Sequence, residues 1–141
     1  HSDAVWVEDG TIDFYDKGGL SSTIYANKID HRGKGTKMTL GCIDFSKFIK
    51  DNFKLSDYII VKMDIEGAEY KVIEKMLEKG TFEYIDEFYI EFHGSKIKDL
   101  YPYYDEVKER TGFDAKAHLI QEIDKFDVNW DVYPYNNWGN F

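Results

Sequence analysis

The stretch from residue 58 to residue 80 constrains the fold most, because its hydrophobic spacing changes from that of a strand to that of a helix across a short acidic turn. Apolar residues run almost without a break from Tyr58 to Met63. Such a run is typical of a strand covered on both faces, as in a parallel sheet. From Val72 onward the apolar residues recur at helical spacing, and Gly80 is placed to end the helix. The stretch therefore predicts a strand, a tight turn and a helix.

The turn in this unit carries three carboxylates and a glycine, namely Asp64, Glu66, Gly67 and Glu69. In open α/β sheets such a turn lies at the carboxyl edge of the strands, where ligands bind. Helical spacing places Glu69 on the inward face of the helix, together with Val72. Alternatively, Glu66 and Glu69 only complement the positive end of the helix, a contribution of about 0.3–1 kcal/mol each.

A second apolar strand is predicted over residues 84–93, after a connection of the length that a parallel βαβ unit requires. Its alternation places Phe88 and Ile90 on one face, and Glu91 and His93 on the other. Right-handed crossovers join parallel strands, whose carboxyl ends share one edge of the sheet. We therefore expect Glu91 and His93 to lie beside the acidic turn. The alternative is a surface histidine that makes one hydrogen bond.

The N-terminal part of the chain predicts further strands. The Asp-Gly pair at positions 9–10 lies between two β-prone runs and predicts a hairpin, because a type I′ turn needs positive φ at both central residues. A glycine-rich loop follows. Residues 37–43 predict a strand, and Asp44 or Ser46 can cap a helix whose apolar residues face the core, namely Phe45, Phe48, Ile49 and Phe53.

The C-terminal part predicts a closing unit for a mixed sheet. Residues 95–112 read as a helix, and residues 115–123 and 126–132 read as two strands. Together these two strands suit an antiparallel hairpin. The aromatic tail at 133–138 suits docking on its own domain, with a sugar-stacking surface as the alternative.

Composition excludes several classes of function. The net charge of −9 argues against nucleic-acid and membrane-surface partners, which need a basic face. No apolar run approaches the ~20 residues of a membrane span, and no signal sequence is recognisable at the start. Cys42 is the single cysteine, which excludes an internal disulfide and fits a reducing, cytoplasmic setting.

The residues around the acidic turn resemble those of a known family. The string at 61–69, Val-Lys-Met-Asp-Ile-Glu-Gly-Ala-Glu, followed by a helix and then by Tyr-Ile-Glu-Phe-His at 89–93, is similar to the FkbM-type methyltransferases. The opening residues from Ala4, the Ser21-Ser22 pair and Asp44-Phe45 look like that family too. The resemblance implies a Rossmann-like class I methyltransferase sheet that uses S-adenosylmethionine to methylate hydroxyl groups of sugars or secondary metabolites.

The same resemblance predicts which part of such a domain is present. Class I methyltransferases hold the cofactor mainly through a Gly-rich loop after their first strand and an acidic residue that ends their second. Neither motif is found, and the chain begins about where the family's third strand ends. We therefore expect residues 1–141 to form a single, partial domain that lacks the N-terminal cofactor-binding strands. The alternative function is a non-catalytic fragment, or a half-domain that binds a glycan or a protein partner.

Within this hypothesis each candidate residue has an expected role. His93 is the predicted general base, because its reference pKa near 6.5 suits neutral pH better than that of a carboxyl. Glu91 would orient His93, and Asp64 would lie near the acceptor or cofactor. Glu66, Gly67 and Glu69 are predicted to bind substrate or cofactor, with a Mg²⁺ or Ca²⁺ site at the two carboxylates as a less favoured option. Exposed sheet edges would favour self-association.

Overall fold

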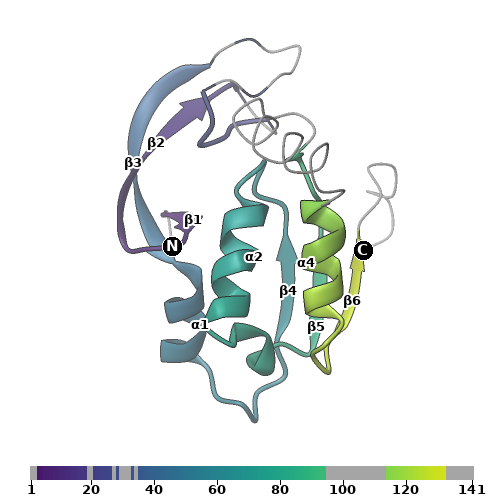
Figure 1. Ribbon diagram of the computed structural model, residues 1–141. Helices are drawn as coiled ribbons and strands as arrows, with labels where there is room; N and C mark the ends of the chain where they lie inside the picture. The colour runs from purple at the N-terminus through teal and green to yellow at the C-terminus, as the bar shows by residue number, and fades with distance from the viewer. Residues whose placement is uncertain are drawn as a thin grey trace.

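The structure is a computed structural model that describes residues 3–18, 21–26, 28, 33, 35–94 and 114–132. Its described elements form two three-stranded sheets and the helices that join and cover them (Figure 1). In chain order they are β1 Ala4–Trp6, β2 Gly10–Asp16, β3 Thr36–Asp44, α1 Phe45–Asn52, β4 Ile60–Met63, α2 Glu69–Glu78, η1 Thr81–Tyr84, β5 Glu87–Ile90, α4 Ala115–Ile123 and β6 Asn129–Val132.

The first sheet has the order β1-β3-β2, with β1 parallel and β2 antiparallel to β3. The hairpin predicted at positions 9–10 is therefore wrong, because β3 lies between the two strands that it would join. The Asp9 carboxylate instead links the connection between β1 and β2 to the end of β3. It accepts a hydrogen bond from the backbone N–H of Asp44 at 3.1 Å and pairs with Lys47 at 2.6 Å. A local turn signal could not reveal this more distant partner strand.

Helix α1 begins as predicted. The Asp44 side chain accepts a hydrogen bond from the N–H of Lys47, which makes Asp44 the N-cap. Ile49 is buried, whereas Phe53 follows the last helical residue and is 37% exposed. The prediction that Phe53 faces the core is thus wrong, because the chain leaves the helix in extended conformation at this residue.

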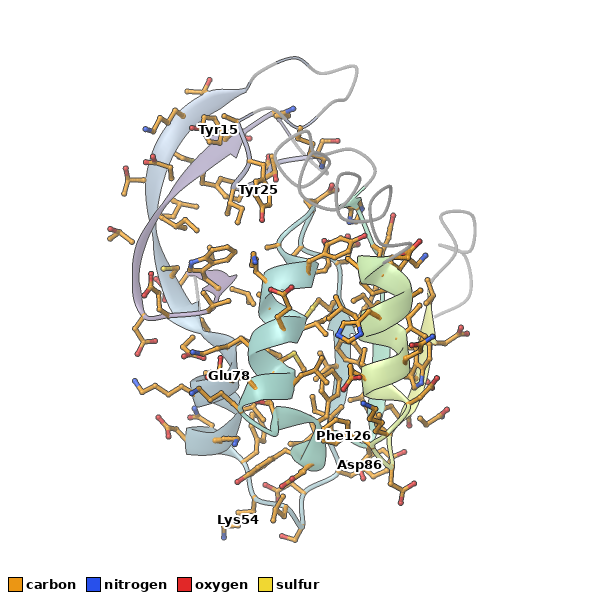
Figure 2. All side chains as sticks on the ribbon, in the orientation of Figure 1. Tyr15, Tyr25, Lys54, Glu78, Asp86 and Phe126 are labelled. Atoms are coloured by element: carbon orange, nitrogen blue, oxygen red, sulfur yellow. The ribbon has the colours of Figure 1, made fainter. Side chains whose placement is uncertain are left out.

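The second sheet is fully parallel, in the order β4-β5-β6. Its β4–α2–β5 unit confirms the predicted strand, turn and helix, and Gly80 has the left-handed conformation expected just after α2. Asp86, at the lower end of the sheet in Figure 2, joins the three strands. Its carboxylate accepts the N–H of Ile59 at 2.7 Å, and its carbonyl oxygen accepts the N–H of Asn129 at 2.9 Å.

The main core lies between this sheet and helices α2 and α4, which cover one of its faces (Figure 1). Phe88 and Ile90 on β5 are fully buried there, as their alternation predicted. Phe126, labelled in Figure 2, packs against Phe82 with ring centroids 5.6 Å apart. Ile60 on β4 is 58% exposed, so the prediction that this strand is covered on both faces is wrong.

The C-terminal prediction needs a larger correction. Residues 115–123 form helix α4 and no strand, because Asp114 caps the segment and its buried side chains recur every fourth residue, namely Ala115, Leu119 and Ile123. The strand that follows, β6, pairs parallel with β5, so these two segments do not form the predicted antiparallel hairpin. The helix predicted at 95–112 and the tail at 133–138 lie outside the described residues. Among the described helices, none has the length and apolar character to span a bilayer.

We expect Asp114→Ala to lower the free energy of unfolding by about 1 kcal/mol, because the N–H of Ala117 loses the carboxylate that it donates to. Asp114→Asn should retain most of the stability, since an amide oxygen can cap equally well. Urea unfolding followed by circular dichroism measures both variants. Equal stability of the alanine and asparagine variants would contradict this account of how α4 begins.

Candidate functional site

The carboxyl ends of β4 and β5 bring the acidic turn and His93 together, as the parallel pairing predicted. Three carboxylates surround the Nε2 atom of His93. Glu91 Oε1 lies 3.1 Å from it, Glu66 Oε2 lies 3.6 Å from it and Asp64 Oδ1 lies 3.9 Å from it. His93 is only 2% exposed, so the alternative of a surface histidine is wrong.

The other ring nitrogen of His93 contacts Glu69. Nδ1 lies 2.8 Å from Glu69 Oε1, and the same oxygen accepts the N–H of Ile65 at 3.2 Å. Glu69 is completely buried, on the inward face of α2 as helical spacing predicted. Glu69, rather than Glu91, is therefore placed to orient the imidazole through Nδ1, while Glu91 lies at the opposite nitrogen.

The backbone of the acidic turn is held in an unusual conformation. Glu66 has a φ of 55°, and Gly67 follows with a φ of 115°. A positive φ is uncommon for a residue with a side chain and costs on the order of 1–3 kcal/mol. Gly67 thus allows the backbone to turn here, since its φ is one that other residues rarely adopt.

Two side chains that the sequence analysis did not single out hold Glu66 in place. Thr23 Oγ1 donates a hydrogen bond to the carbonyl oxygen of Glu66 at 2.7 Å. Lys28 forms an ion pair with Glu66 Oε2, and its side chain is 1% exposed. Both residues belong to the segment between β2 and β3, which reads as a solvated loop. No local sequence signal links them to a turn about 40 positions later.

These surroundings set the charge of His93. Burial disfavours the imidazolium and by itself lowers the pKa of His93. The hydrogen bond to Glu69 and the charges of Glu69, Glu66 and Glu91 outweigh burial, so the pKa of His93 lies above its ordinary value. We assign the proton of the neutral imidazole to Nδ1, because its contact with Glu69 at 2.8 Å is shorter than the 3.1 Å contact between Nε2 and Glu91, and Nε2 then presents a lone pair. In the charged state Nε2–H also donates.

Three of these side chains also offer a set of donor atoms for a cation. One atom each of Asp64, Glu91 and His93 lies within 4.8 Å of the others. A protonated His93 already provides the positive charge and the hydrogen bond that this arrangement calls for, at 3.1 Å from Glu91. The donor set alone therefore does not require a metal ion.

The raised pKa of His93 predicts a pH-dependent stability. Protonation favours the folded state, so the stabilisation is fully present below the unfolded pKa of about 6.5 and is lost as the pH rises through the higher folded pKa. Urea midpoints between pH 5.5 and about 9 should fall for the wild type and change less for His93→Gln. His118→Gln, which alters an exposed histidine on α4, should behave like the wild type. A wild-type slope in His93→Gln would contradict the assignment.

Comparison with known proteins identifies the family. A family model for the methyltransferase FkbM domain matches residues 6–124, which is most of the 141-residue chain. No curated protein and no solved structure matches it. The α/β architecture, with one mixed and one parallel sheet, fits a methyltransferase-like fold. With its acidic turn and His93 at the carboxyl edge of two parallel strands, the chain belongs to the FkbM methyltransferase family.

Proposed function

We propose that this chain is the catalytic part of an S-adenosylmethionine-dependent methyltransferase that acts on a hydroxyl group. The observation that carries the proposal is the convergence of Asp64, Glu91 and His93 at one sheet edge, with Glu69 buried behind the imidazole. A methyltransferase needs a methyl donor, and family membership supports that requirement. We further propose that the acceptor is a hydroxyl group and that the donor is S-adenosylmethionine.

In this mechanism His93 accepts the proton of the acceptor hydroxyl at Nε2. Glu69 holds Nδ1–H, which directs the Nε2 lone pair toward the carboxylate cluster. Asp64 is 24% exposed at its side chain and is the most exposed of the groups around His93, so we propose that the acceptor enters from its side. Glu91, at 3.1 Å from Nε2, then stabilises the imidazolium that forms.

S-adenosylmethionine, when bound, supplies a methyl group on a positively charged sulfur. The chemistry of the donor set fits such a molecule, because the cluster presents carboxylates to a cationic centre. Asp64 would hold the positive part of the cofactor. Glu66 is less available for this purpose, since its carboxylate is paired with Lys28.

A sugar or a related polyhydroxylated compound is the acceptor class that we propose. A hollow of about 540 Å³ under the curved first sheet is lined by two aromatic residues, two acidic residues, two threonines and two isoleucines: Trp6, Glu8, Thr11, Ile12, Asp13, Ile24, Tyr25 and Thr39. Tyr25 lies on the side of the β2–β3 ribbon that faces α2 (Figure 2). Flat rings with polar groups at their rim suit a sugar ring and its hydroxyls.

We expect His93→Gln to lower kcat by about 10²–10⁴-fold in the full-length protein, the usual contribution of a general base. Asp64→Asn should also reduce turnover strongly. Methyl transfer from labelled S-adenosylmethionine to a panel of sugars measures both. The matched control is His118→Gln, and unchanged rates in the two site variants would remove these assignments.

Glu69→Gln should move the acid limb of kcat/KM to lower pH, because it removes a charge that raises the pKa of His93.

The second candidate function is a non-catalytic half-domain that binds a partner. The observation that favours it is a group of exposed apolar side chains beside β4, which is an edge strand among the described residues: Phe53, Leu55, Tyr58 and Ile60. Open strand edges and apolar patches mark interaction surfaces. The same surface supports the proposal of self-association.

Calorimetric titration with S-adenosylmethionine distinguishes the two functions. We expect micromolar binding that weakens in Asp64→Asn, because the cofactor's positive charge loses its carboxylate. Equilibrium dialysis with labelled cofactor detects binding that releases no measurable heat. Absence of binding in both measurements would favour the partner-binding half-domain.

We also propose a cellular compartment for this protein and the part of the domain that the chain represents. The free, buried thiol of Cys42 supports a reducing, cytoplasmic setting. We also propose that residues 1–141 are a single portion of the methyltransferase domain, in line with a family match that spans most of the chain.

A further inference from the structure

The contact between Lys28 and Glu66 is unusual because the lysine is buried. The Lys28 side chain is 1% exposed and the Glu66 side chain is 19% exposed. Burial of an ammonium group costs several kcal/mol unless it is paired and hydrogen-bonded. Lys28 meets both conditions, since it pairs with Glu66 and also donates to the carbonyl oxygen of Ser21 at 3.2 Å.

The segment that carries Lys28 is itself anchored. Lys17 Nζ donates to the carbonyl oxygen of Lys28 at 2.9 Å. Thr23 forms a bridge to Tyr15 on β2 through two backbone hydrogen bonds of 2.7 and 3.2 Å, and its hydroxyl holds the carbonyl oxygen of Glu66. The segment between β2 and β3 thus contacts both the backbone and the side chain of Glu66, the residue whose φ is positive.

Lys28 and His93 share one oxygen atom. Glu66 Oε2 is the atom that pairs with Lys28, and the same atom lies 3.6 Å from His93 Nε2. Among the described residues, the other ionisable groups that lie within 4 Å of the ring nitrogens of His93 are the carboxylates of Asp64 on the turn, Glu69 on α2 and Glu91 on its own segment. Lys28 is therefore the lysine that the described contacts place against this cluster.

We propose that Lys28 is a positioning residue of the site. Its ammonium group fixes the Glu66 carboxylate and neutralises the negative charge that Glu66 would otherwise present to His93. A base must be neutral to accept a proton, and every carboxylate near Nε2 favours the imidazolium. When Lys28 neutralises one of these carboxylates, a larger fraction of His93 is in the neutral form, which can accept a proton. This role rests on the proposed function, although its central measurement does not require turnover.

The experiment is an NMR titration of the His93 imidazole, assigned by loss of its signals in His93→Gln. Lys28→Met should raise the apparent pKa of His93, whereas Lys28→Arg should leave it near the wild-type value because the charge is kept. Lys37→Met is the matched control, since Lys37 forms an exposed ion pair with Asp13 on the first sheet. An unchanged His93 titration in Lys28→Met would overturn the proposal.

A second pair of variants keeps the test valid if Lys28→Met does not fold. Glu66→Gln and the double variant Lys28→Met/Glu66→Gln both lack the carboxylate at position 66. The double variant therefore contains neither a buried carboxylate nor a buried ammonium group that has lost its partner. The pKa of His93 should be higher in the double variant than in Glu66→Gln. Equal values would overturn the proposal.

The methyl-transfer assay separates this proposal from the proposed function. If both hold, the acid limb of kcat/KM moves to higher pH in Lys28→Met and returns in Lys28→Arg. If the imidazole titration responds but neither the wild type nor any variant transfers a methyl group, the proposed function fails, whereas the effect of Lys28 on the charge of His93 is confirmed. If the wild type is active and the titration does not respond, Lys28 has no such role.

Discussion

The buried contact between Glu69 and His93 is the interaction on which the site depends. It joins the first residue of α2 to the segment after β5, and so it fixes the helix and the strand relative to each other at the sheet edge. A fully buried carboxylate is tolerated because Oε1 receives a backbone N–H and faces the imidazole. Its Oε2 atom is buried and has no hydrogen-bond partner among the described residues. The orientation of the imidazole follows from this contact, and the contact raises the pKa of His93 together with the charges of Glu66 and Glu91.

The two sheets contribute differently to this arrangement. The parallel sheet supplies the reactive side chains, because the ends of β4 and β5 lie at the same edge. The mixed sheet supplies no group that contacts His93 among the described contacts, yet the segment after β2 holds Glu66 through Thr23 and Lys28. A strained turn is thus maintained by contacts from outside its own strand–helix unit, as strain at functional sites generally requires.

Several elements could be predicted from the sequence because their signals are local. The change of spacing between 58 and 80 predicted β4, the turn and α2, and Asp44 predicted the start of α1. The prediction failed where local signals competed with tertiary pairing. The Asp-Gly pair favoured a hairpin, but both flanking strands pair with β3. The strand predicted over residues 115–123 is wrong for a different reason, because Ala115, Leu119 and Ile123 repeat at helical spacing and Asp114 can cap, so the local signal for a helix is present.

The amino-acid sequence alone predicts that carboxylates and a histidine meet at one edge, because a helical crossover between two apolar strands makes the strands parallel. It also determined that Glu69 faces inward, because α2 has one apolar face. Which carboxylate contacts which nitrogen of His93, and the pairing of Lys28 with Glu66, depend instead on how the elements pack in space. Those contacts join residues 24 and 38 positions apart, and their geometry depends on how separate elements pack, which no local spacing encodes.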